Sequence, residues 1–152
     1  MSSDLENLYQ QVILDHSKKR NGNEPLTDPA WPGRSHQVNP TCGDEITLEV
    51  NVAEPDGAIE IRWDGQGCSI SMASASVLTD LVGDVGPDGI DAVVDEFNEL
   101  MHSRGKADPD EEVLGDAAAF SGVSKYPARI KCALLAWAAF SDALRQARTM
   151  KG

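Results

Sequence analysis

The chain has 152 residues, of which 41% are hydrophobic, and its formal net charge is −12. This length is sufficient for one hydrophobic core, so residues 1–152 are expected to form a single domain. The negative charge disfavours nucleic acids and anionic membranes as partners. No stretch approaches the roughly 20 apolar residues that span a bilayer, and the N-terminus carries no apolar targeting segment, so a cytoplasmic location is expected.

The first half of the chain predicts a helix followed by a small sheet. Apolar residues at helical spacing predict a helix that ends near His16, and a polar, proline-containing segment follows it over residues 17–33. Alternating apolar residues then predict strands over 46–52 and 59–63, joined by a turn at 54–57. The alternation indicates that one face of this hairpin is buried, and that Glu49 lies with other polar residues on the opposite face.

The remaining elements complete the expected fold. A third strand is predicted over residues 35–38, before the hairpin. Helices are predicted from a cap at Ser69 or Ser71 to Val82, and over residues 90–101, 113–120 and 127–150, with a glycine- and proline-containing loop at 83–89. This order indicates an α+β fold, in which helices pack on one face of a small antiparallel three-stranded sheet.

Three cysteines and one aspartate are candidate metal ligands. Cys42 and Asp44 fall between predicted strands, Cys68 begins a predicted helix after a glycine-rich turn, and Cys132 lies in the first turns of the last helix. An odd number of cysteines in a reducing compartment favours metal binding or thiol chemistry, although buried structural cysteines are the alternative. If the four residues converge, three sulfurs and one oxygen make a tetrahedral zinc site.

The chemistry of such a site favours sulfur transfer. A helix N-terminus favours the thiolate of Cys68, and a thiolate that is exchanged off a metal is a nucleophile. Arg129 and Lys131 come shortly before Cys132 and are expected to offset the negative charge of the site. The alternative is that both are simply solvent-exposed on the helix. The three histidines are expected to be packed or solvated side chains and not ligands.

Three segments together resemble a known family. They are Asn39 to Asp44, Gly65 to Ser69 and Arg129 to Ala133. In this order they resemble the IscU and NifU N-terminal type of iron–sulfur cluster assembly protein, and the resemblance spans nearly the whole chain. It implies an IscU/SufU-like fold.

The resemblance also implies roles for individual residues. Cys42, Asp44, Cys68 and Cys132 match the metal ligands of the family. Cys42 matches the cysteine that receives persulfide sulfur from a cysteine desulfurase of the SufS type. Arg129 matches an arginine thought to assist this transfer, and it is therefore a candidate catalytic residue with Cys42.

Two departures favour the SufU branch of the family. Scaffolds of the IscU type carry a histidine before the third cysteine and a double-proline segment, whereas this chain has Lys131 and a single proline, Pro127. The resemblance then implies a zinc-dependent sulfurtransferase that passes sulfur to downstream iron–sulfur assembly proteins. The alternatives are a scaffold that holds a [2Fe–2S] cluster on the same residues and an interaction module with structural zinc.

Overall fold

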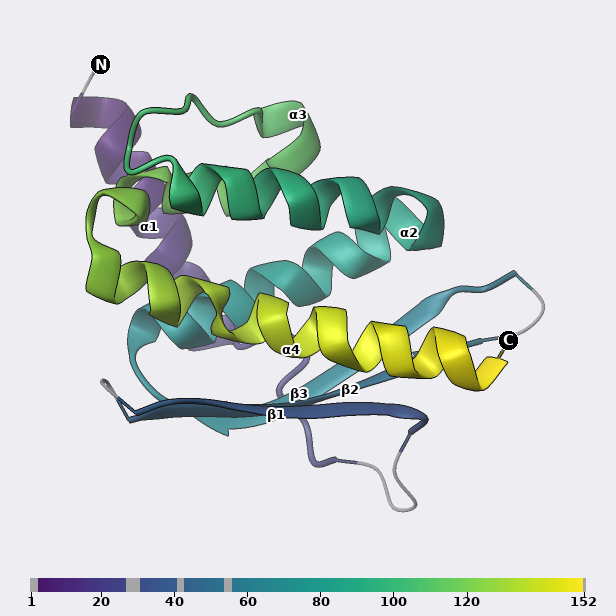
Figure 1. The fold of residues 1–152 in the computed structure, drawn as a ribbon. Coiled ribbons are helices and arrows are strands. Elements are labelled where there is room, and N and C mark those ends of the chain that lie inside the picture. The colour runs from purple at the N-terminus through teal and green to yellow at the C-terminus, as the bar shows by residue number, and fades with distance from the viewer. Residues whose placement is uncertain (1–2, 27–30, 41–42, 54–55, 152) are drawn as a thin grey trace.

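The computed structural model describes residues 3–26, 31–40, 43–53 and 56–151. Cys42, and the predicted turn residues Glu54 and Pro55, lie outside the described residues. In chain order the elements are α1 (Ser3–Lys19), β1 (Gly33–Asn39), β2 (Asp44–Val52), β3 (Ile59–Gln66), α2 (Ser69–His102), α3 (Glu111–Leu114), the 3₁₀ helix η1 (Gly115–Lys125) and α4 (Pro127–Lys151) (Figure 1). The predicted α+β fold with a three-stranded sheet is confirmed.

The sheet is antiparallel, with the strand order β1-β2-β3. Asn39, the last residue of β1, pairs with Asp44, the first residue of β2. On the other side of β2, Glu45 pairs with Gln66, which ends β3. The end of β1, the start of β2 and the end of β3 therefore share one edge of the sheet, and Cys68 follows this edge directly.

One face of the sheet is buried as the alternation predicts, but the opposite face is not fully exposed. Ile46, Leu48 and Val50 are almost completely buried. Glu49, which was expected on the exposed face, is buried as well. Its Oε2 accepts hydrogen bonds from the Nη2 and Nε of Arg34 at 2.7 and 3.0 Å. The backbone N–H of Trp31, two residues before β1, also donates to Glu49 on this second face.

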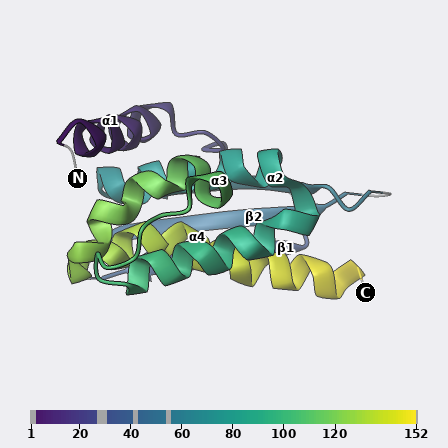
Figure 2. The ribbon, with the colours of Figure 1, turned by 90° about the horizontal axis from the view of Figure 1, so that it is seen from above.

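The helices lie together on the other face of the sheet, as Figures 1 and 2 show. α4 packs against β1 and β2, α2 packs against β3, and α1, α3 and η1 pack against α2. The rings of Phe97 in α2 and Trp137 in α4 stack with their centroids 4.1 Å apart. The Nε1–H of Trp137 donates to Ser74 at 2.9 Å, so the buried indole is satisfied. These contacts fix the position of α4 relative to α2.

The predicted loop at residues 83–89 is wrong in extent. α2 runs through this segment, and its non-helical backbone angles are confined to Gly86, with φ 72° and ψ −176°. Glycine adopts this positive φ without a steric penalty, and Pro87 is then suited to the first turn of the renewed helix. The predicted helix at 113–120 is likewise divided between α3 and η1.

His16 connects three helices. It is buried near the C-terminal end of α1, with Nδ1 at 2.7 Å from Ser76 Oγ in α2 and Nε2 at 2.9 Å from Asp116 Oδ2 in η1. Both ring nitrogens are therefore satisfied, which agrees with the prediction that His16 is a packed histidine. α1 itself continues past His16 to Lys19.

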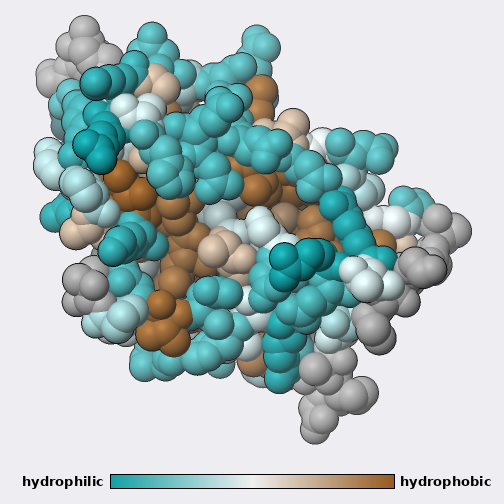
Figure 3. Space-filling model, in the orientation of Figure 1, coloured by the Kyte–Doolittle hydropathy of each residue, from teal (hydrophilic) through white to brown (hydrophobic). Residues whose placement is uncertain are grey.

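A groove opens between the second half of α2 and the second half of α4. Its volume is about 420 Å³, and Val94, Phe140 and Leu144 are among its lining residues. Figure 3 shows hydrophobic surface between these two helices, whereas the surrounding surface in this view is mostly hydrophilic. The two arginines in the lining are paired, Arg145 with Asp142 and Arg148 with Asp91. Within the described residues, no helix has the length and apolar character needed to cross a membrane.

Candidate metal centre

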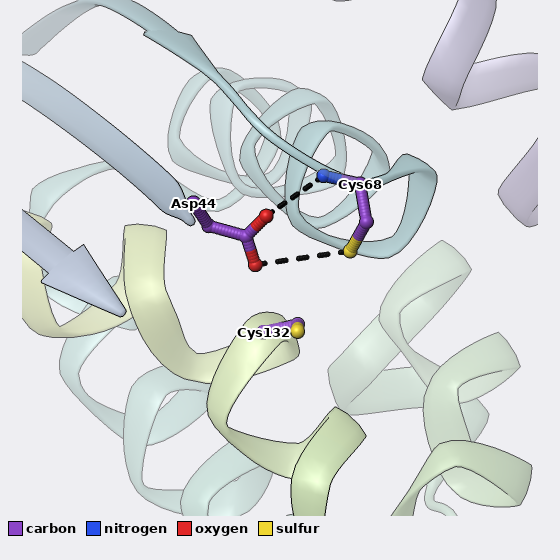
Figure 4. Close-up of side chains that lie close together, drawn as sticks. All are labelled: Asp44, Cys68 and Cys132. Carbon is purple, nitrogen blue, oxygen red and sulfur yellow. Dashed lines mark hydrogen bonds between the residues drawn. The ribbon is translucent and has the colours of Figure 1, made fainter. Parts of the chain in front are cut away.

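Asp44, Cys68 and Cys132 converge at the sheet edge where β2 begins. Asp44 is the first residue of β2, Cys68 is the N-cap of α2, and Cys132 lies in the second turn of α4 (Figure 4). One ligand atom from each lies within 4.8 Å of the other two. Three of the four predicted ligands are thus brought together by segments that are far apart in the sequence.

Asp44 is buried, yet every contact favours its ionised form. Oδ1 accepts the backbone N–H of Cys68 at 2.8 Å, and Oδ2 accepts the hydroxyl of Ser71 at 2.8 Å. Burial alone would raise the pKa of Asp44, but these hydrogen bonds, with smaller ones from the two cysteine thiols, outweigh burial and lower the pKa below its usual value. A metal ligand must be deprotonated, and Asp44 meets this condition at neutral pH.

Cys68 is the accessible member of the cluster. It is exposed, and as N-cap it has extended backbone angles, φ −70° and ψ 166°. Its Sγ lies 3.8 Å from Asp44 Oδ2 and 3.6 Å from Ser71 Oγ. The prediction that Ser69 or Ser71 caps α2 is wrong, because Cys68 occupies the cap position and its N–H is satisfied by Asp44. The predicted location of Cys68 at the helix N-terminus is confirmed.

Cys132 is held in the interior. Its exposed fraction is 2%, and its Sγ lies 3.8 Å from the carbonyl oxygen of Ala128, one helical turn earlier. The side-chain amide of Asn39 donates to the same sulfur at 3.7 Å. Asn39 is itself 5% exposed, so an N–H donor from the end of β1 is fixed against this sulfur. Donors of this kind orient a metal ligand and stabilise its anionic form.

Gly67 allows Asp44 and Cys68 to approach each other. A Cβ built at this position would overlap Oδ1 of Asp44. The glycine-rich turn predicted before α2 is thus the place where the backbone passes close to this carboxylate. A side chain at residue 67 would therefore displace the carboxylate of Asp44, the candidate oxygen ligand of the cluster.

The described donors fit zinc. Zinc takes four ligands in tetrahedral geometry from thiolates, imidazoles and carboxylates, and Zn–S distances of about 2.3 Å place two ligand sulfurs about 3.8 Å apart. The three candidate ligand atoms all lie within 4.8 Å of one another, which is close to the spacing that a zinc site requires. Cys42, the fourth predicted ligand, lies outside the described residues, but its neighbours in sequence Asn39 and Asp44 pair across β1 and β2.

The predicted roles of the basic residues beside Cys132 stay predictions. Arg129 and Lys131 are both exposed on α4. The Arg129 guanidinium lies 5.7 Å from the centroid of the Tyr126 ring. Neither side chain is among the groups that hydrogen-bond to the described ligand atoms. The side chains of Asn39 and Ser71 do contact these atoms, and neither was predicted from the sequence to support the candidate ligands.

Comparison with known proteins decides the family. The model of the NifU-like N terminal domain matches residues 8–133, a span that includes Cys42, Asp44, Cys68 and Cys132. The chain belongs to this family. The resemblance inferred from the three sequence segments is therefore confirmed.

Relatives within the NifU-like family carry two kinds of name. The chain is 41% identical over 140 residues to the zinc-dependent sulfurtransferase SufU of Bacillus subtilis, covering 91% of this chain and 90% of that protein. It is 39% identical over 145 residues to the iron–sulfur cluster assembly scaffold protein IscU of Streptococcus pyogenes, covering 95% and 87%. Both names concern sulfur transfer or iron–sulfur cluster assembly.

A solved structure of a further NifU-like relative has the same fold. It is a putative iron–sulfur cluster assembly scaffold protein for the SUF system from Fervidobacterium islandicum, with a TM-score of 0.70 and 30% identity. The similarity covers 88% of this chain and 93% of that chain. The IscU/SufU-like fold expected from the resemblance is thus confirmed.

Proposed function

We propose that this protein is a zinc-dependent sulfurtransferase of iron–sulfur cluster biogenesis. The observation that carries the proposal is the convergence of Asp44, Cys68 and Cys132, in which one sulfur is exposed and the other is buried. The name of the Bacillus subtilis relative agrees with this assignment. The proposed metal ligands are these three residues and Cys42.

Each of the three described ligands has a different role in the proposed metal centre. Cys132 anchors the metal, because its sulfur is buried and fixed by Asn39. Asp44 supplies an ionised oxygen that is already oriented by two hydrogen bonds. Cys68 is on the solvent side. When bound, zinc keeps the coordinated cysteines as thiolates at neutral pH.

Cys42 is the proposed sulfur acceptor, with a cysteine desulfurase of the SufS type as donor. The Cys42 thiolate attacks the outer sulfur of a persulfide on the desulfurase, and a new sulfur–sulfur bond forms. The original sulfur–sulfur bond breaks, and the desulfurase cysteine leaves as a thiolate. No net oxidation occurs, because one thiolate and one persulfide are exchanged for another pair. Downstream iron–sulfur assembly proteins are the proposed recipients, and Arg129 is proposed to assist the exchange.

The second candidate is a scaffold that assembles a [2Fe–2S] cluster on the same four residues. It is favoured by the names of the Streptococcus and Fervidobacterium relatives. The position of Lys131 argues against it, because scaffolds of the IscU type have a histidine there, and Lys131 is exposed and lies outside the ligand cluster. Iron–sulfur clusters are held by cysteine and, in some sites, histidine, so lysine is not suited to replace that histidine as a ligand.

The proposed function predicts zinc-dependent stimulation of a SufS-type desulfurase. Cysteine turnover should rise severalfold when zinc-loaded protein is added, and should stay near the basal rate with protein from which zinc was removed by a chelator. Restoring zinc to the second sample should restore the stimulation. Equal stimulation by zinc-loaded and zinc-free protein, or none by either, would overturn the proposal.

A further inference from the structure

The hydroxyl of Ser71 contacts all three described ligand residues. Its Oγ lies 2.8 Å from Oδ2 of Asp44, 3.6 Å from Sγ of Cys68 and 3.3 Å from the backbone carbonyl oxygen of Cys132. Ser71 is only 2% exposed, so solvent does not compete for these contacts. It lies three residues after the N-cap, in the first turn of α2. This buried hydroxyl, where β2, α2 and α4 meet, is placed to orient the side chains of the candidate ligands.

We propose that Ser71 is a positioning residue that orients Asp44 for metal binding. The inference rests on the part of the proposed function that places a metal on Asp44, Cys68 and Cys132, and it does not require sulfur transfer. Through Asp44, Ser71 sets both the affinity of the centre for its metal and the rate at which the metal is released.

The two shortest hydrogen bonds to Asp44, both 2.8 Å long, act on different oxygens. The Cys68 N–H holds Oδ1, and this contact alone leaves the carboxylate free to turn about that oxygen. Ser71 holds Oδ2, which is the oxygen that approaches the Cys68 sulfur, and so fixes the plane of the carboxylate. A carboxylate oxygen has more than one acceptor site, so Oδ2 can accept the hydroxyl and bind a metal together. Hydrogen bonds to ligating carboxylates of this kind support metal affinity.

Ser71 also has other acceptors if Asp44 turns away. The carbonyl oxygen of Cys132 and the sulfur of Cys68 are both within reach of its hydroxyl. A buried donor that loses its acceptor costs free energy unless a new acceptor is available. Ser71 therefore orients Asp44 without making release of the carboxylate costly, which suits a centre whose ligands are exchanged.

The test compares Ser71→Ala with Ser76→Ala in the full-length protein. Ser76 is a matched control, because it is a buried serine of the same helix whose hydroxyl bonds to His16 and accepts the N–H of Asn21, away from the cluster. Zinc affinity is measured by competition with a chromophoric chelator, and zinc release by the rate of transfer to an excess of that chelator. The absorption spectrum of the cobalt(II)-substituted protein reports the ligand geometry, with Asp44→Ala as the reference for loss of the carboxylate.

Ser71→Ala should bind zinc about 10- to 100-fold more weakly than wild type and should release it faster. Its cobalt spectrum should shift toward that of Asp44→Ala, while Ser76→Ala should keep the wild-type affinity and spectrum. Wild-type affinity in Ser71→Ala, or weaker binding with an unchanged cobalt spectrum, would overturn the positioning role. Failure of the wild-type protein to bind zinc or cobalt would overturn the proposed function, and the inference with it.

Discussion

Replacing Cys132 by serine is expected to remove the bound metal and to lower the melting temperature of the protein. Cys132 is 2% exposed, and its sulfur accepts the side-chain amide of Asn39 at the end of β1, so a solvent ligand has little access to its place. Structural zinc sites contribute apparent binding free energies on the order of 10 kcal/mol at neutral pH, and much of this contribution supports the fold. Elemental analysis and thermal unfolding of the same samples measure both losses.

A chelator provides the control for Cys132→Ser. It should lower the melting temperature of the wild-type protein, but should have little effect on the variant, which has already lost the metal. Cys68→Ser is expected to change zinc content and stability in the same direction. If Cys132→Ser keeps stoichiometric zinc and the wild-type melting temperature, Cys132 is not a ligand and the proposed centre is wrong.

Replacing Cys42 by alanine is expected to abolish sulfur transfer to this protein. Persulfide formation needs a thiolate acceptor, and alanine provides none. After incubation with a SufS-type desulfurase and cysteine, intact mass should show the addition of one sulfur atom to the wild-type protein and none to Cys42→Ala. Stimulation of desulfurase turnover should be lost in parallel.

The folded state of Cys42→Ala is checked by its melting temperature and zinc content. Three ligands are left in this variant, so a chain that is still folded and holds some zinc but accepts no sulfur would assign the acceptor to residue 42. Persulfide on another cysteine of Cys42→Ala, at the wild-type rate, would assign the acceptor elsewhere. Such a result would separate metal binding from sulfur acceptance in this protein.

The sheet could be predicted because strand periodicity depends on neighbouring residues only. Ile46, Leu48 and Val50 alternate with polar residues, and all three lie in the core. The burial of Glu49 could not be predicted in this way. It depends on Arg34 and on the backbone N–H of Trp31, which both donate to Glu49 on the second face of the sheet. Only the tertiary structure brings these groups together.

The length of the non-helical break in α2 was overestimated for a related reason. Gly83, Gly86, Pro87 and Gly89 are all loop signals, but helix packing on both sides confines the break to Gly86. Leu81 and Val82 before this break, and Ile90 after it, are buried in one core. Tertiary burial of this kind overrides local propensity.

The candidate ligands could be predicted from their residue types, but their surroundings could not. Cysteine and aspartate in turns and at a helix start are visible in the sequence, whereas the convergence of Asp44, Cys68 and Cys132 requires three distant segments to pack. Ser69 or Ser71 was predicted to be the helix cap because serine is common at that position. In the structure neither is the cap. The hydroxyl of Ser71 bonds instead to Asp44, an acceptor 27 residues away in the chain. The amide of Asn39 likewise acts on a cysteine 93 residues away.

The metal content of anaerobically purified protein, determined by elemental analysis with an optical spectrum, tests the proposed function most directly. A zinc sulfurtransferase predicts one zinc per chain and no visible chromophore, because Zn²⁺ has a filled d shell. Iron and sulfide in the sample, together with visible charge-transfer absorption, would contradict this prediction and would establish the cluster scaffold.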